Sequence, residues 1–342
     1  MSAQRAESIF TDLPLELDGI SLGNLDAGKS LPLKAWPAGK NIDLVAWVEN
    51  NVDFLEQALL TGGAVLFRGF GPVSVDSIER FADAVFTTRI PYEFPLTPRR
   101  KISDFIYDAS LIPPEQYLGL HSECCIQRDW PMNIVFGCVS PAESGGETPL
   151  ADNRKVHDRI PTEIRDRFAR LGVMYEWNIS NAWLSGVFGT AHPSSIEEYC
   201  DQNEYQFKWN DQGGIQLLFN CEAILEHPIS GEKVWFNIAT HFLGSIYPFV
   251  NSRSSIPGPV PALERETGGR FAFYGDGSPI SDRDVTEIHN AFITESVTFS
   301  WQKGDIILLD NMLTAHGRHR YTGGRKILLA MGNPHQRLMA AT

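Results

Sequence analysis

The stretch KGDIILLDNMLTAHGR, residues 303–318, is the part of the sequence that decides the fold. Its apolar run Ile306 to Leu309 has the length of a buried strand. A Gly-Asp turn precedes the run and an Asp-Asn turn follows it, so both ends of the predicted strand are marked. His316 stands where the chain re-enters the sheet after the second turn. A jelly roll places strands from distant parts of a chain side by side, so this histidine can meet residues from a much earlier strand.

From Leu118 onward the sequence consists mainly of short strand candidates that are separated by Gly, Pro, Asn and Asp. Many short strands with frequent turns are typical of an antiparallel sandwich or jelly roll and not of a parallel α/β sheet. We therefore expect a mostly β fold with flanking helices, built as a double-stranded β-helix, the cupin-like jelly roll. The further strand candidates are residues 132–139, 172–177, 205–209, 215–219, 233–238, 297–301 and 326–331.

The N-terminal part adds one strand and one helix. A Gly-Gly pair precedes the apolar run Ala64 to Phe67, which has the composition of a buried strand. Apolar residues at helical spacing from Ile78 to Val85 predict a helix that Ser74 or Asp76 can cap. The sequence contains no repeat, low-complexity tract or linker, so we expect residues 1–342 to form one domain. Two more helices are predicted, over residues 161–171 and 282–292.

Composition and charge limit the classes of function. The 342 residues are 43% apolar and 21% charged, which is typical of a globular protein, and no run of about 18 apolar residues is present to cross a membrane. The net charge of −13 repels phosphate backbones, so we expect no nucleic-acid partner. The first 14 residues lack the apolar centre of a secretory signal, and the five cysteines form no C-x-x-C pair, so we expect a cytoplasmic protein with reduced thiols.

A metal-binding pattern occurs in Leu120-His121-Ser122-Glu123. In an extended segment, positions i and i+2 point to the same side, so the imidazole and the carboxylate can reach one ion. Such a pair often arises by chance and then lies on the surface or in a hydrogen bond. Together with His316, however, it would form the set of two histidines and one carboxylate that binds non-haem iron and leaves three adjacent positions open for a bidentate cosubstrate and O₂.

Other residues compete for this role. His241 is the one serious rival ligand, since His227 lies in a turn and His289 in an amphipathic helix. Cys124 and Cys125 directly follow the pair and could bind a softer metal. Thiolates beside an O₂-activating iron are readily oxidised, so we interpret both cysteines as packing groups.

Five segments carry a family resemblance, which extends over nearly the whole chain. The sequence resembles the taurine dioxygenase family of Fe(II)/2-oxoglutarate oxygenases, and in particular its amino-acid-modifying branch, which includes syringomycin-type aspartyl hydroxylases. None of the segments would be specific alone, but together they are. They are GAVLFRGF (63–70), GGETPLAD (145–152), GEKVWFN (231–237), YGDGSPI (274–280) and residues 304–318.

The resemblance implies a role for individual residues. His121, Glu123 and His316 match the family's iron ligands, with Glu in place of the commoner Asp. Thr148 matches a threonine that helps to hold 2-oxoglutarate, and Arg325 matches the arginine that binds the distal carboxylate of this cosubstrate. A planar guanidinium is suited to that contact because it can donate two parallel hydrogen bonds to one carboxylate.

Four more side chains have roles that stay open or need to be distinguished. Lys326 is next to Arg325, but strand alternation is expected to send the two side chains to opposite faces. Arg318, like Arg320, can bind the cosubstrate or a carboxylate of the substrate, or can lie exposed in a loop. Asn237 can bind substrate, or can be a core or turn asparagine.

The resemblance implies an enzyme of secondary metabolism that oxidises a small amino acid or related carboxylate with O₂ and 2-oxoglutarate. Hydroxylation is the default outcome, and desaturation or cyclisation would need only a different fate of the substrate radical. Halogenation is disfavoured because Glu123 takes the position that a halide would need. The chain is apolar at Cys124 to Ile126 and at 215–220, where that branch is more polar, which indicates a smaller or more apolar substrate, with Ile215 to Phe219 near its side chain.

Three alternatives stay open. The substrate can be an aminoacyl group on a peptidyl carrier protein, although an acidic carrier would be repelled by a net charge of −13 unless a basic patch such as Arg99-Arg100-Lys101 overrides it. The chain can be a cupin-like metal enzyme that does not use 2-oxoglutarate. It can also be a non-catalytic jelly-roll binding protein in which His121 and Glu123 are incidental.

Overall fold

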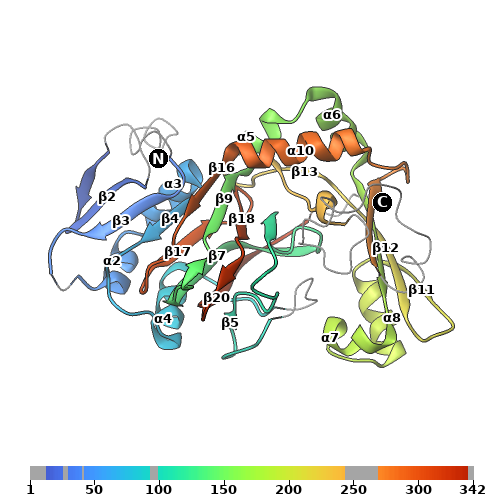
Figure 1. The fold of residues 1–342 in the computed structure, drawn as a ribbon, viewed down its shortest axis with the longest axis horizontal. Helices are drawn as coiled ribbons and strands as arrows, with labels where there is room; N and C mark the ends of the chain where they lie inside the picture. Colours follow the sequence, from blue (N-terminus) through green and yellow to red (C-terminus); the bar gives the residue numbers. More distant parts are fainter. Residues whose placement is uncertain (1–12, 26–29, 41, 93–98, 243–268, 338–342) are drawn as a thin grey trace.

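The structure, a computed structural model, describes residues 13–25, 30–40, 42–92, 99–242 and 269–337. Its largest element is an eight-stranded sheet that runs through the centre of the molecule to the N-terminal end (Figure 1). The order of its strands is β1 (Leu15–Leu17), β2 (Ile20–Asn24), β3 (Leu33–Pro37), β4 (Ala64–Phe67), β17 (Ile306–Asp310), β7 (Asp129–Ser140), β20 (Lys326–Gln336) and β5 (Tyr107–Asp108).

A second sheet of four strands packs on one face of this main sheet. Leu150 and Phe299 from the second sheet lie in one apolar cluster with Ile307 and Leu309 of β17. The two sheets therefore face each other across a shared core, as in a sandwich. The second sheet has the order β16 (Ser296–Phe299), β9 (Thr148–Asp152), β18 (Thr314–Arg318) and β6 (Leu118–His121).

Helices cover the other face of the main sheet. Ile306 and Leu308 alternate with Ile307 and Leu309, and they pack in a separate cluster with the helices near the N-terminus. Burial on both faces explains why β17 has four consecutive apolar residues and no polar alternation. The helices are α2 (Leu44–Asn50), α3 (Val52–Gly62) and α4 (Val75–Val85), the last of which is capped by Ser74 as one of the two expected caps.

A third sheet lies at the opposite end of the molecule from β1 to β3 (Figure 1). It contains the 215–219 segment, whose Ile215, Leu217 and Phe219 are buried in the largest apolar cluster. Its order is β11 (Gln206–Trp209), β12 (Ile215–Cys221), β10 (Val173–Ile179) and β15 (Gly269–Tyr274). The remaining elements are α5 (Asn153–Arg159), α6 (Thr162–Leu171), α7 (Leu184–Phe188), α8 (Pro193–Gln202), α10 (Asp282–Glu295), the 3₁₀ turns η1 (Asn181–Trp183) and η2 (Ala239–His241), and the short strands β8 (Ser144–Gly145), β13 (Ile224–Glu226), β14 (Lys233–Trp235) and β19 (Tyr321–Thr322).

The expectation of a mostly β chain with flanking helices is confirmed, and each predicted strand and helix is present. Some details differ. β3 and β4 are parallel, the strand expected to reach residue 238 ends at Trp235, and the one expected to reach residue 301 ends at Phe299. Helices α2, α3, α5, α7 and α8 were not predicted. No helix in the described part of the chain is long and apolar enough to span a membrane.

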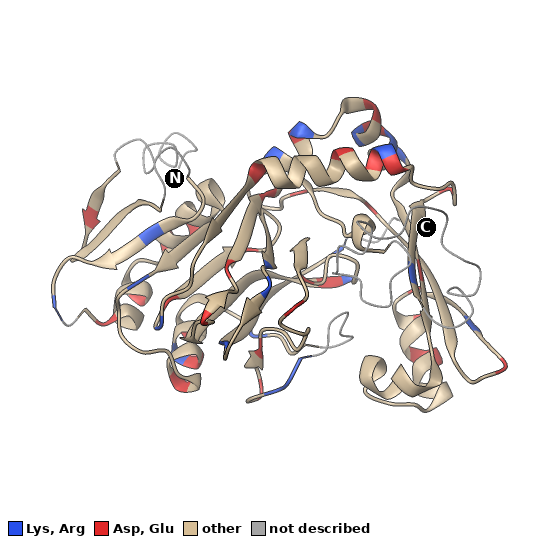
Figure 2. Ribbon diagram, viewed as in Figure 1, with Lys and Arg blue, Asp and Glu red and all other residues tan. Residues whose placement is uncertain are grey.

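Charge is mixed over the outer helices. Helix α6 carries both acidic and basic side chains, whereas α10 carries mainly acidic ones (Figure 2).

A buried ion pair joins the end of β4 to the start of β17. Arg68 donates from Nε to Oδ1 of Asp305 at 3.0 Å and from Nη2 to Oδ2 at 2.7 Å. The Asp305 carboxylate is fully buried and also accepts a hydrogen bond from the backbone N–H of Gln302. The Gly-Asp turn seen in the sequence is thus held by a bidentate contact with the neighbouring strand.

We predict that Asp305→Ala lowers the free energy of unfolding by about 3–5 kcal/mol, because it leaves the Arg68 charge without its partner. Asp104→Ala is the matched control, since this aspartate forms an exposed ion pair with Lys101 and should leave stability nearly unchanged. Urea unfolding followed by circular dichroism measures both. Equal losses in the two variants would contradict the role given to Asp305.

Candidate metal centre and its cavity

Two predicted ligands lie on adjacent strands of the second sheet. His316 of β18 is the register partner of His121 of β6, and the two imidazole ring centroids are 4.6 Å apart. Both side chains are buried. The jelly-roll argument from the sequence therefore leads to the observed contact, although 195 positions separate the two residues (316 − 121 = 195).

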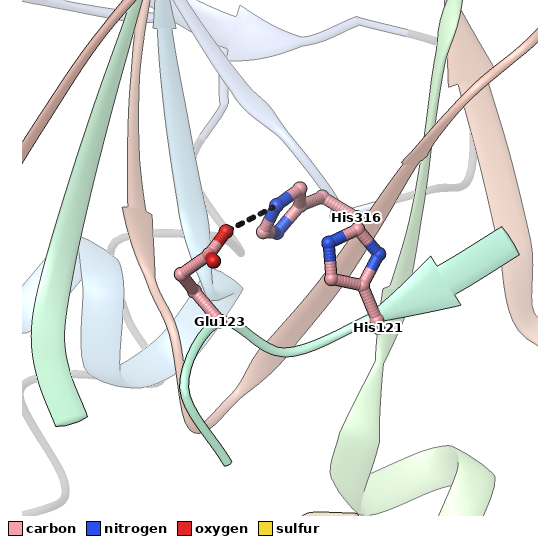
Figure 3. A group of neighbouring side chains, drawn as sticks. All are labelled: His121, Glu123 and His316. Carbon is pink, nitrogen blue, oxygen red and sulfur yellow. Dashed lines mark ion pairs between the residues drawn. The ribbon is translucent and has the colours of Figure 1, made fainter. Parts of the chain in front are cut away.

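Glu123 completes the group, but not by strand alternation as expected. β6 ends at His121, and the chain then turns, with Cys124 at a φ of 57°. The turn directs the Glu123 carboxylate toward the histidines (Figure 3), and its Oε2 lies 3.9 Å from Nε2 of His316. The ligand atoms of the three residues all lie within 4.8 Å of one another.

Asn311 fixes the backbone at Glu123. Its Oδ1 accepts a hydrogen bond from the Glu123 N–H at 2.7 Å, and its Nδ2 donates to the Glu123 carbonyl at 2.9 Å. The same Nδ2 also donates to the carbonyl of Pro131. The Asp-Asn turn therefore ends β17 and also positions Glu123, and the second role was not visible in the local sequence pattern.

Burial keeps the two imidazoles neutral. It lowers the pKa of His121, and it lowers that of His316 well below the ordinary value, with His121 adding to the effect. Nδ1 of His121 lies 2.8 Å from the carbonyl oxygen of Gly119, which places the proton on Nδ1 and leaves a lone pair on Nε2. Neutral imidazoles with a free lone pair are metal ligands.

The rival ligand His241 lies outside the group. Its ring centroid is 6.3 Å from that of His121, and it packs against Gly119, where a Cβ atom would come within 2.6 Å of Nε2. Burial, together with His121 and His289, lowers the pKa of His241 to about 3. Cys124 and Cys125 are buried, and burial raises the pKa of each thiol, so both stay protonated packing groups as expected.

A cavity opens beside the two histidines. Three arginines contribute to its described lining, together with polar residues such as Thr148 and Ser110 and apolar groups such as Phe136. The arginines are Arg99, Arg318 and Arg325. Thr148 and Arg325, which were expected to hold a cosubstrate, therefore do lie next to the candidate ligands. Lys326 is exposed and is not part of the lining, so the expected separation of the two neighbouring cations is confirmed.

Thr148 and Arg325 are both held in place by other groups. Nε1 of Trp301 donates to Oγ1 of Thr148 at 2.9 Å, and Nε of Arg325 donates to the carbonyl of Gly146 at 3.2 Å. Burial lowers the pKa of Arg325 to about 10, with a contribution from the positive charge of Arg318. The guanidinium therefore remains charged at neutral pH.

Arg318 lines the cavity, so the expectation of an exposed loop arginine is wrong, while its binding of a cosubstrate or substrate stays a prediction. It is buried in β18 and not exposed in a loop, and three backbone carbonyls accept hydrogen bonds from its guanidinium. Arg318 thus anchors the 112–116 segment to β18. Arg320, by contrast, is exposed. The acceptors for Arg318 are Ile112 and Pro113 at 2.8 Å and Gln116 at 2.9 Å.

Two predicted contributors to substrate binding are not in the described lining. Asn237 donates to the carbonyl of Ala223 at 2.9 Å and accepts from the N–H of Ala239 at 3.1 Å, so its amide holds the chain after β14. The 215–219 segment is part of the core of the third sheet. Neither lies among the residues around the cavity.

Arg99 is the residue at the centre that sequence reasoning missed. It was considered only as part of a surface patch with Arg100 and Lys101. The structure separates the three: Lys101 pairs with Asp104, Arg100 pairs with Asp108, and Arg99 pairs with Glu123. No local sequence signal distinguishes the buried arginine from its exposed neighbour.

The chain is similar to known proteins over most of its length. The family model of the taurine catabolism dioxygenase TauD, TfdA family matches residues 29–331. The dapdiamide synthesis protein DdaC of Enterobacter agglomerans is 28% identical over 287 residues, which are 82% of this chain and 85% of that protein. A clavaminate synthase-like protein of Arabidopsis thaliana is 24% identical over 298 residues, 83% of this chain and 86% of that protein.

Solved structures share the fold at low identity. PvcB of Pseudomonas aeruginosa superposes with a TM-score of 0.55 and 13% identity, over 93% of this chain and 92% of that chain. A taurine dioxygenase of Burkholderia xenovorans gives a TM-score of 0.51 and 15% identity, over 92% of this chain and 89% of that one. With a family match over most of its length, the chain belongs to the taurine catabolism dioxygenase TauD, TfdA family.

Proposed function

We propose that this dioxygenase binds Fe(II) through His121, Glu123 and His316 and uses 2-oxoglutarate and O₂ to oxidise a small amino acid or related carboxylate. The observation that carries the proposal is the buried group of two histidines and one carboxylate beside a cavity lined by arginines. We also propose that the two packed sheets are the halves of a double-stranded β-helix, and that residues 1–342 form one domain.

The donor set fits Fe(II). Two neutral nitrogens and one carboxylate oxygen are the ligands that non-haem Fe(II) enzymes use, and the neighbouring Cys124 thiol stays protonated. The hydrogen bond of His121 to Gly119 fixes its ring in the required tautomer. Bound iron, together with 2-oxoglutarate and O₂, supplies an oxidant that can remove hydrogen from an unreactive C–H bond.

Arg325 and Thr148 would hold 2-oxoglutarate. The Arg325 guanidinium can pair with the distal carboxylate, where its charge makes the contact stronger than a neutral hydrogen bond. The Thr148 hydroxyl accepts a hydrogen bond from Trp301, so its own proton is available to donate to the cosubstrate. The apolar side chains of Phe136, Leu118 and Ile327 around this position exclude water from the reacting groups.

The names of two similar proteins support a role in biosynthesis. One relative is called a dapdiamide synthesis protein. PvcB is described as an Fe, alpha-ketoglutarate dependent oxygenase from an isonitrile synthetic pathway. Both descriptions fit an oxygenase of secondary metabolism. Hydroxylation remains the reaction that we propose, since it needs the fewest further assumptions about the substrate radical.

We predict that the wild-type chain binds one Fe(II). His121→Ala, Glu123→Ala and His316→Ala should each weaken Fe(II) binding by at least about 100-fold, because mutation of a residue that only hydrogen-bonds to a metal ligand already lowers metal affinity about 10- to 100-fold. Anaerobic titration with a colorimetric iron assay measures the stoichiometry. His241→Asn, which alters the rival ligand, should keep one Fe(II). Stoichiometric iron in Glu123→Ala would show that the ligand set is wrong.

We predict that Arg325→Ala raises the apparent KM for 2-oxoglutarate about 30- to 1000-fold, because a charge-assisted contact contributes about 2–4 kcal/mol. Thr148→Val should remove a hydrogen bond that contributes about 1 kcal/mol, which raises the apparent KM for 2-oxoglutarate about fivefold. Succinate release at varied 2-oxoglutarate measures both. Lys326→Ala is the matched control and should leave KM unchanged. A large effect of Lys326→Ala with none of Arg325→Ala would contradict the assignment.

We predict that the enzyme turns over a free amino acid or related carboxylate and not one bound to a carrier protein. The chain's net charge of −13 opposes approach of an acidic carrier. The test offers candidate small amino acids both free and loaded on a peptidyl carrier protein, and follows product mass in each. Turnover confined to the loaded form would overturn the prediction.

A further inference from the structure

Arg99 lies inside the candidate active site. Its side chain is only 3% exposed, and it lines the cavity together with His121 and His316. Nη2 of Arg99 donates to Oε2 of Glu123 at 2.6 Å. The guanidinium carbon also lies 4.6 Å from the centroid of the Tyr92 ring. A cation is therefore fixed between an aromatic ring and the proposed carboxylate ligand.

Part of the Arg99 guanidinium is not used by the protein. Nε and Nη1 are buried, and neither has a hydrogen-bond partner within the part of the chain that the structure describes. Leaving buried donors of a charged group unsatisfied is costly, so such a group is suited to receiving a ligand. Nη2 contacts Glu123, and Arg99 also forms a side-chain hydrogen bond with Tyr92, so Nε and Nη1 are the donors that are left.

The charges around the cavity point to an anionic ligand. Three arginines and no carboxylate belong to its described lining, while Glu123 lies next to it behind Arg99. Arg318 also lines the cavity, but three backbone carbonyls already accept hydrogen bonds from its guanidinium. Fe(II), Arg99, Arg318 and Arg325 would carry five positive charges, against three negative charges on Glu123 and 2-oxoglutarate. This excess of positive charge favours an anionic substrate.

We infer that Arg99 binds a free carboxylate of the substrate through Nε and Nη1, while Nη2 holds Glu123. The inference rests on the proposed function and gives to Arg99 the task that the sequence had offered to Arg318. It assigns the substrate class as small molecules with an unesterified carboxylate group. A compound in which that carboxylate is converted to an amide would lose the contact.

The contact can be measured without turnover. Mn(II) replaces iron, and N-oxalylglycine replaces 2-oxoglutarate; these two ligands occur together in a structure with the same fold. Acetate is the anionic probe, and acetamide is its neutral counterpart of the same size. Mn(II) accelerates proton relaxation of a methyl group bound nearby, so NMR relaxation gives the dissociation constant of acetate for wild type, Arg99→Gln, Arg99→Lys and Arg100→Gln.

We predict that acetate binds the loaded wild-type protein and acetamide does not. Arg99→Gln should weaken acetate binding at least about tenfold, because a hydrogen bond to a charged partner is lost. Arg99→Lys should lose less, since it keeps the charge but not the planar donors. Arg100→Gln is the matched control: its arginine is 66% exposed in the side chain, and acetate binding should not change.

Three outcomes would overturn the inference. Equal acetate affinity in wild type and Arg99→Gln would do so, as would equal binding of acetamide and acetate. A loss of Mn(II) affinity in Arg99→Gln, with unchanged acetate affinity at saturating Mn(II), would show that Arg99 serves only to hold Glu123. If Arg99→Gln does not fold by circular dichroism, Arg99→Lys decides, and unchanged acetate affinity in it overturns the inference. Failure of wild type to bind Mn(II) and N-oxalylglycine would instead overturn the proposed function.

Discussion

The proposed centre depends on one turn, in which Asp310 and Asn311 hold the end of the main sheet against the strand that carries His121. Asp310 accepts hydrogen bonds from the N–H groups of Met312 and Leu313 and contacts Nε2 of the buried His227 at 3.0 Å. Asn311 bonds both backbone groups of Glu123. Without this turn, a carboxylate outside regular structure would have no fixed position beside two histidines that a sheet holds rigidly.

The candidate site lies where paired strands of the sandwich meet irregular segments of the chain. The ligand histidines belong to paired strands, which fixes their separation, whereas Arg99 and Glu123 come from irregular segments that can approach them from the side. Burial lowers the pKa of both kinds of group, but with different results. It keeps the imidazoles neutral and able to bind a metal, while the arginines keep their charge because their ordinary pKa is so high. The result is a site that favours anionic ligands around a metal.

Much of the fold could be predicted, because strands and turns leave local signals. The apolar run of β17 between two turns and the Ser74 cap of α4 are visible within a few residues. Five helices, α2, α3, α5, α7 and α8, were missed, and for α5 and α8 the physical reason is visible. α5 is a short helix of seven residues, and α8 buries only Ile196 and Cys200, so neither has the wide apolar stripe that predicts a helix.

The sequence by itself determined the chemistry available: which residues can bind a metal, which arginine follows His316 at the spacing of the family, and which segments form strands. Only the tertiary structure decided how those groups are used. In the structure, Glu123 lies in a turn after the strand, and backbone carbonyls accept hydrogen bonds from Arg318. Asn237 bonds to the backbone outside the cavity lining, whereas Arg99 is part of that lining. The reason is that a side chain's role depends on its partners, and the partners of these residues are often distant in the chain, as Asn311 is from Glu123.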